Sequence, residues 1–151
     1  AAEAGADAVL LAPVSYLPLT QEEAFQHFLA VASASDLPLC IYNNPGTTHF
    51  RFSLELMERL ANIPRITAVK MPLPADVSLV DDLARLRTVL PSDFAIGYSG
   101  DWGIADAFLA GADTFYSGFE FSFASVFQDH VASHAKPNQR DALIVVVFIY
   151  V

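Results

Sequence analysis

The sequence contains little cysteine and few basic residues, and each shortage excludes a class of protein. Cys40 is the only cysteine among the 151 residues, so no disulfide can form within the chain and a reducing, cytoplasmic setting is expected. Because Cys40 lies inside an apolar run, it is predicted to be a packed thiol rather than a nucleophile. Lysine and arginine together number 8 against 17 aspartates and glutamates, which gives a formal net charge of −9. With no basic cluster, no nucleic-acid partner is predicted.

Signals for export or membrane insertion are also missing. Residues 1–5 contain neither the basic region nor the apolar core of a signal peptide, which again favours the cytoplasm. The apolar run at residues 141–151 has no helical period and is too short to span a membrane as a helix, so no membrane partner is predicted. We expect one folded domain over residues 1–137 and an atypical apolar tail over 138–151 that is non-native or truncated.

Short apolar runs alternate with stretches of helical periodicity, which is the pattern of strands joined by crossover helices. Thr20 and Glu23 form a capping box that opens the first predicted helix, Ser53 and Ser78 open the next two, and Asp101 is predicted to cap a fourth. The near-continuous apolar character of the runs predicts a parallel sheet with right-handed crossovers. These runs occupy residues 8–12, 39–42, 66–70, 94–98 and 114–117.

Two α/β architectures fit this alternation: an open, doubly wound sheet, or part of a (β/α)8 barrel. A doubly wound nucleotide-binding sheet has a glycine-rich phosphate loop after an early strand. Here the first run is followed by Pro-Val-Ser-Tyr at residues 13–16, without a glycine that would let a pyrophosphate approach the backbone. The sequence therefore disfavours nucleotide binding.

Two chemically distinctive residues stand at the ends of successive predicted strands. Lys70 closes the apolar run at 66–69 and is one of only two lysines, the other being Lys136. Tyr42 closes the preceding run. In α/β barrels the catalytic groups gather at the carboxyl ends of the strands. An amine beside a phenol at this edge predicts carbonyl chemistry through a Schiff base.

Three motifs resemble those of the dihydrodipicolinate synthase and N-acetylneuraminate lyase family, the pyruvate-dependent class I aldolases. The segment Tyr-Asn-Asn-Pro-Gly at 42–46 is similar to the family's stretch after the fifth barrel strand. Lys70 follows Tyr42 by 28 positions, the spacing of the family's Schiff-base lysine. The Ser-Gly-Asp turn at 99–101 resembles the turn after the seventh strand. The resemblance extends over about residues 1–137.

The resemblance implies an incomplete (β/α)8 TIM barrel that contains about the last five βα units and lacks the first three strands. It implies a lyase or aldolase that acts on pyruvate or a related 2-oxo acid without a metal or an organic cofactor, and a parent protein that is a homo-oligomer. Lys70 would form the imine and Tyr42 would shuttle protons. The substrate-binding residues would be Gly100, Asn44, Thr47 and Tyr16.

The sequence also departs from the family pattern. Thr47 stands where dihydrodipicolinate synthases have an arginine for the second substrate's carboxylate, and Thr47 cannot form that bidentate ion pair. Met-Pro-Leu-Pro follows Lys70 at 71–74 in place of the common Glu/Asp-x-Ser-Gly. We therefore expect a second substrate other than aspartate semialdehyde, and both aldol chemistry and dehydration remain open.

Two alternatives to an active lyase follow from the same sequence. The first is a catalytically inactive barrel fragment that is stabilised by a partner, because an incomplete barrel leaves sheet edges unpaired. The second is an open α/β module that binds a small anion. His130 and His134 lie four residues apart on a predicted helix, but no third ligand is near them, so no metal site is predicted.

Overall fold

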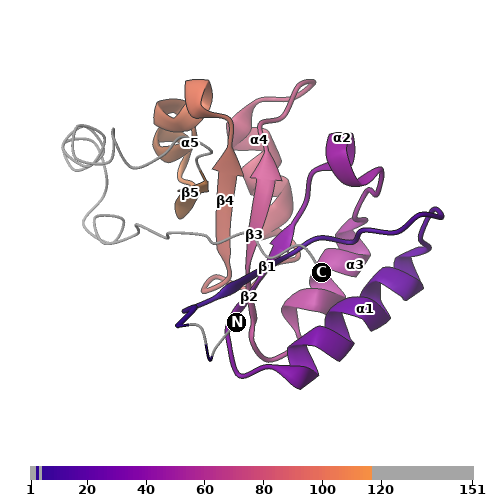
Figure 1. Ribbon diagram of the computed structural model, residues 1–151. Coiled ribbons are helices and arrows are strands. Elements are labelled where there is room, and N and C mark those ends of the chain that lie inside the picture. Colours follow the sequence, from indigo (N-terminus) through magenta and orange to yellow (C-terminus); the bar gives the residue numbers. More distant parts are fainter. Residues whose placement is uncertain (1–2, 4, 117–151) are drawn as a thin grey trace.

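The computed structural model describes residue 3 and residues 5–116. Its centre is a parallel sheet of five strands in the order β1-β2-β3-β4-β5 (Figure 1). The strands are β1 (Val9–Leu11), β2 (Leu39–Tyr42), β3 (Ile66–Pro72), β4 (Ala95–Ser99) and β5 (Thr114–Tyr116). Each predicted apolar run overlaps one of them, and β3 and β4 extend past the predicted ends, to Pro72 and Ser99. Because the strand order follows the chain without reversal, the sheet has no topological switch point of the doubly wound kind.

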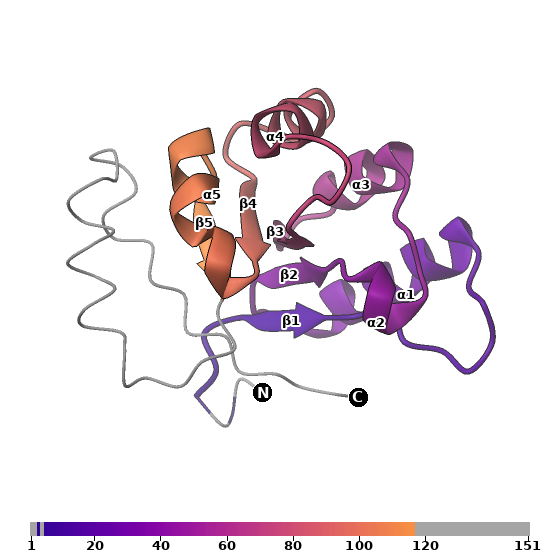
Figure 2. The ribbon, with the colours of Figure 1, turned by 90° about the horizontal axis from the view of Figure 1, so that it is seen from above.

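Helices connect successive strands and lie along one side of the sheet. Viewed from above, the strands form an arc and the helices lie outside it (Figure 2). This is the arrangement of a barrel wall, with an outer face under the helices and an inner, concave face. The helices are α1 (Gln21–Ala34), α2 (Pro45–Thr48), α3 (Leu54–Ala61), α4 (Leu79–Arg87), the 3-10 turn η2 (Asp101–Gly103) and α5 (Ile104–Ala110).

Side-chain caps fix where the first three long helices begin. The Thr20 hydroxyl accepts from the Glu23 amide at 3.2 Å, and the Glu23 carboxylate accepts from the Thr20 amide at 2.8 Å, which completes the predicted capping box of α1. The hydroxyl of Ser53 caps α3, and that of Ser78 caps α4. The prediction that Asp101 caps a helix is wrong. Asp101 instead lies in η2, and the residue before α5 is Gly103, which has no side chain to cap with.

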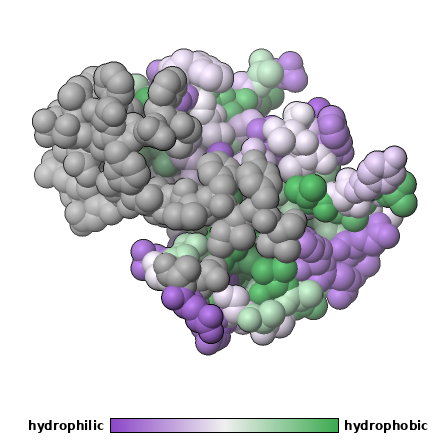
Figure 3. All heavy atoms as spheres, in the orientation of Figure 1, coloured by the Kyte–Doolittle hydropathy of each residue, from purple (hydrophilic) through white to green (hydrophobic). Residues whose placement is uncertain are grey.

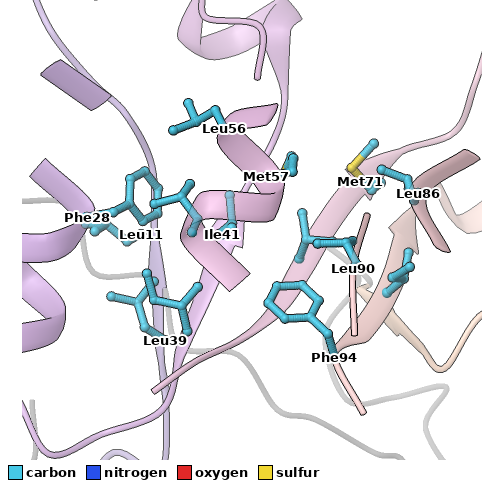
Figure 4. Close-up of a cluster of buried hydrophobic side chains, with 14 of the residues drawn as sticks. Leu11, Phe28, Leu39, Ile41, Leu56, Met57, Met71, Leu86, Leu90 and Phe94 are labelled. Atoms are coloured by element: carbon cyan, nitrogen blue, oxygen red, sulfur yellow. The ribbon is translucent and has the colours of Figure 1, made fainter. Parts of the chain in front are cut away.

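The main core lies between the sheet and the helices (Figure 4). Side chains alternate along each strand, so Leu39 and Ile41 of β2 enter this core, whereas Cys40 and Tyr42 belong to the opposite face. The largest buried side chains include Phe28 of α1 and Leu56 of α3. Hydrophilic residues gather on the outside of α1 (Figure 3). The outer face of the sheet is therefore sealed by helices, as in a barrel.

A smaller apolar cluster lies on the inner face of the sheet. Leu10, Cys40, Ala68 and Tyr116 are buried there, and Tyr42 and Ala95 pack against them. Every one of the five strands contributes a residue to this cluster. The Lys70 side chain lies on the same face, next to the Tyr42 and Tyr116 rings of this cluster.

Several predictions concern residues outside the described part of the chain. These are the domain boundary between 137 and 138, the apolar tail over 138–151, and the helix that carries His130 and His134. They stay predictions.

Candidate active site

Lys70 and Tyr42 lie side by side on the inner face of the sheet. They are register partners on β3 and β2, so their side chains leave neighbouring strands at the same level and on the same side. The Lys70 Nζ is 4.8 Å from the centroid of the Tyr42 ring. The structure thus brings together the amine and the phenol that the sequence singled out. Lys70 is not the last residue of its strand, because β3 continues through Met71 and Pro72.

The Lys70 amine is half-buried, and its surroundings favour the neutral form. Burial lowers the pKa of Lys70 below its ordinary value, because the charged ammonium is the form that loses most hydration. The negative charges that Tyr42, Cys40 and Asp101 can carry act in the opposite direction, but they are the smaller effects. A lysine must be neutral to attack a carbonyl carbon, so burial moves Lys70 toward its reactive form.

Asn44 holds the phenol of Tyr42 at the start of α2. Its side-chain amide donates a hydrogen bond to the Tyr42 hydroxyl at 3.3 Å. The Asn44 carbonyl accepts from the amides of Thr47 and Thr48 at 3.0 and 2.9 Å, which winds the Pro-Gly-Thr-Thr segment into a single helical turn. The sequence indicated only a turn here. Thr47 is exposed on that turn, close in sequence to the Tyr42–Asn44 pair.

The structure gives Gly100 a role in the backbone. Its φ of 124° lies in the region that disfavours side chains, and a Cβ built there would come within 2.6 Å of the Leu73 Cδ1. Gly100 is therefore required by the turn after β4 and by the close approach of Leu73. Its place at the carboxyl end of β4 still puts it on the edge of the sheet where Lys70 lies.

Tyr16 does not approach Lys70 in the structure. Its side chain is fully exposed on the loop between β1 and α1. That loop and the end of α2 enclose a hollow of about 280 Å³, which does not include Lys70 or Tyr42. The residues around it are Pro13, Ser15, Tyr16, Leu17, Pro18, Leu19, Thr48, His49 and Phe50.

Two residues near Lys70 had no functional role in the sequence-based reasoning. The ring of Tyr116 on β5 lies with its centroid 5.9 Å from the Lys70 Nζ. The Tyr116 hydroxyl lies 3.1 Å from the Sγ of Cys40. As predicted, Cys40 is a buried thiol, and burial raises its pKa to about 12. The alternation of residues along β5 could have placed Tyr116 on the inner face, but not beside a thiol three strands away.

Within the described residues, no group of three or more histidine, cysteine, aspartate or glutamate side chains is placed to hold a metal ion. The same part of the chain contains no helix long and apolar enough to cross a bilayer.

The fold and the inner-face lysine define a segment of an α/β-barrel protein. The model of the Dihydrodipicolinate synthetase family matches residues 1–136, and the chain belongs to this family. This agrees with the resemblance found in the sequence motifs.

The relatives of this chain are lyases. It is 44% identical over 109 residues to 4-hydroxy-tetrahydrodipicolinate synthase of Herminiimonas arsenicoxydans, a match that covers 72% of this chain and 36% of the relative. It is 38% identical over 106 residues to the same enzyme of Listeria welshimeri, covering 70% of this chain and 34% of the relative. The chain thus spans about a third of the length of these curated relatives.

Solved structures confirm the prediction of an incomplete TIM barrel. A dihydrodipicolinate synthase from Agrobacterium tumefaciens superposes with a TM-score of 0.74 at 69% identity, covering 77% of this chain and 39% of that one. A dihydrodipicolinate synthase from Bacillus anthracis gives a TM-score of 0.74 at 29% identity, covering 87% of this chain and 44% of that one. The five described strands are thus part of a barrel of this family.

Proposed function

We propose that this chain carries the imine-forming centre of a pyruvate-dependent lyase, with Lys70 as the amine and Tyr42 as the proton shuttle. One observation carries the proposal. In a chain of the dihydrodipicolinate synthetase family, a half-buried amine with a lowered pKa stands 4.8 Å from the ring of a tyrosine on the neighbouring strand. The substrate would be pyruvate or a related 2-oxo acid.

The chemistry needs one nucleophile and one group that moves protons. The Lys70 nitrogen lone pair attacks the ketone carbon, the newly bonded nitrogen gives up a proton and regains its lone pair, and the carbonyl oxygen takes up a proton, which gives a neutral carbinolamine. A second protonation lets that oxygen leave as water, and the nitrogen lone pair forms the iminium bond. The iminium then accepts electrons from the adjacent C–C or C–H bond. Tyr42 would deliver these protons, and Asn44 orients its hydroxyl by the 3.3 Å hydrogen bond.

The second substrate would lack the carboxylate that dihydrodipicolinate synthases bind with an arginine at the position of Thr47. Thr47 stands on the exposed turn of α2, where it offers a hydroxyl rather than a bidentate cation. Gly100 and Asn44 lie at the same carboxyl edge as Lys70 and would border the bound 2-oxo acid. Tyr16 would reach a substrate only if the loop between β1 and α1 moved. A homo-oligomeric parent protein and a cytoplasmic location complete the proposal.

The experiment is to trap the imine. The intact chain is incubated with pyruvate, reduced with borohydride and digested, and the lysine peptides are examined by mass spectrometry. We expect a reduced pyruvyl group on the Lys70 peptide and none on the Lys136 peptide. Lys70→Ala should abolish labelling, and Tyr42→Phe should slow it by about 10²-fold, the scale of a lost general acid–base group.

Lys136 serves as the internal control, because it is the one other lysine in the chain. Equal labelling of both lysines would indicate nonspecific reaction. An unlabelled Lys70 at saturating pyruvate would show that this chain is catalytically inactive, as the inactive-fragment and anion-binding alternatives require.

A further inference from the structure

The inner face of the sheet contains one side chain that crosses most of its width. Tyr116 starts on β5, and its hydroxyl lies 3.1 Å from the Cys40 Sγ on β2, so the ring spans β4 and β3. Tyr116 is only 5% exposed, and Cys40 only 8%. A buried hydroxyl needs a polar partner, and Cys40 provides it here.

Small residues on the two intervening strands make room for this ring. Gly97 of β4 is the register partner of Lys70, and a Cβ built on Gly97 would come within 2.5 Å of the Tyr116 Cε2. Ala68 of β3 packs in the same inner cluster. A side chain at position 97 would occupy the space of the Tyr116 ring. Thr114 of β5 comes equally close, its Cγ2 at 2.4 Å from the same Cβ, so the Tyr116 ring and Thr114 together explain the glycine beside Lys70.

The ring lies on the amino-terminal side of the amine. Its hydroxyl reaches Cys40, whose register partner on β3 is Ala68, two residues before Lys70. The ring centroid is 5.9 Å from the Lys70 Nζ, and the Tyr42 ring is 4.8 Å from it. Lys70 therefore has an aromatic ring beside it on β2 and a second one that reaches it from β5.

We propose that Tyr116 is a positioning residue for Lys70: its ring, fixed by Cys40 and admitted by Gly97, forms a floor that keeps water from the amino-terminal side of the amine. This inference rests on the proposed imine-forming function. Removal of the floor would hydrate the amine and favour the ammonium form, which cannot attack a carbonyl. Among residues 5–116, the other titratable groups whose charge acts on Lys70 are Tyr42 and Cys40 on β2 and Asp101 in η2.

The test measures the titration of Lys70 without any substrate. The intact chain is acetylated with a trace of acetic anhydride over a range of pH, with an added lysine peptide as the reference amine. The extent of reaction at Lys70 gives the pH midpoint at which its amine becomes neutral. In Tyr116→Leu this midpoint should rise by about one pH unit. At any pH well below the wild-type midpoint, the fraction of neutral amine should then be about tenfold smaller than in wild type. Pyruvate trapping should fall by the same factor.

Tyr98→Leu is the matched control. Tyr98 is a buried tyrosine on β4, but its hydroxyl donates to Asp82 of α4 at 2.9 Å, on the outer face of the sheet. This variant should leave the Lys70 midpoint unchanged. An unchanged midpoint in folded Tyr116→Leu, or an equal rise in Tyr98→Leu, would overturn the proposal.

If Tyr116→Leu does not fold by circular dichroism, Tyr116→Phe decides. That variant keeps the ring but loses its contact with Cys40, and the neutral fraction at Lys70 should fall at least about twofold. No change would refute the role of the floor. If the Lys70 midpoint shifts in the Tyr116 variants as expected but the wild-type chain forms no pyruvate adduct, the proposed function is refuted and the role of Tyr116 is not. The two failures are therefore distinguishable.

Discussion

At the scale of single residues, burial has opposite chemical consequences for two groups on the inner face. It lowers the pKa of Lys70 and raises the pKa of Cys40 to about 12, because in both cases the charged form loses hydration. For the amine the favoured neutral form is the nucleophile. For the thiol the favoured neutral form is inert. The same apolar surface therefore favours the reactive form of Lys70 and the unreactive form of Cys40.

The low reactivity of the Cys40 thiol can be measured by alkylation. With a pKa of about 12, only about one thiol in 10⁴ is ionised near pH 8, and the group is buried as well. We expect no alkylation of the native chain by iodoacetamide at about pH 8, and complete alkylation once the chain is unfolded in urea. Rapid alkylation of the folded chain would contradict the placement of Cys40 beneath Tyr116.

At the scale of elements, helix caps and the strand register determine which residues meet. The capping box at Thr20 sets the start of α1, and the parallel register of β2 and β3 places Tyr42 opposite Lys70. The capping box joins residues that are close in the sequence, and the pairing of Tyr42 with Lys70 follows from parallel strands that end at the same edge of the sheet. The 28-residue spacing between Tyr42 and Lys70 comprises the connection through α2 and α3, residues 43–65, and the first part of β3 up to Lys70.

The contribution of the capping box should be visible in stability. Thr20→Ala leaves the Glu23 amide without its acceptor, and we expect it to lower the free energy of unfolding by about 1 kcal/mol. The measurement is urea denaturation followed by circular dichroism. Ser33→Ala is the control, since Ser33 is exposed in the same helix and bonds only the Leu29 carbonyl there. Its effect should stay within about 0.5 kcal/mol.

At the scale of the whole molecule, the two faces of the sheet differ: the outer face packs against the hydrophobic core, and the inner face holds the candidate active site. The outer face is closed by helices and holds the large core, and the inner face holds Lys70, Tyr42 and the Tyr116 floor. In a complete barrel the inner face is enclosed by the remaining strands. The described strands form one part of such a wall, so the outer core must supply most of their stability.

Loss of a core side chain should therefore be severe. Phe28 is completely buried between α1 and the sheet (Figure 4), and Phe28→Ala should cost about 3–5 kcal/mol, a large part of the stability of a typical domain. Thermal unfolding followed by circular dichroism measures this loss. Leu109→Ala, at a side chain that is 71% exposed, is the control and should change stability by less than about 0.5 kcal/mol. Equal effects would show that the outer core does not hold the sheet together.

The sequence by itself determined the parallel α/β class, the first three helix starts, the family, and the pairing of Lys70 with Tyr42. The class, the helix starts and the pairing depend on apolar periodicity, on caps formed by neighbouring residues, and on the fact that parallel strands end at one edge. The family was indicated by the resemblance of the motifs at 42–46, 70 and 99–101. Only the tertiary structure decided that Asn44 orients Tyr42, that Tyr16 is exposed beside a hollow without Lys70, and that Tyr116 reaches Cys40. Such contacts depend on the curvature of the sheet and on which small residues leave room across it. No pattern within a single segment of sequence contains that information.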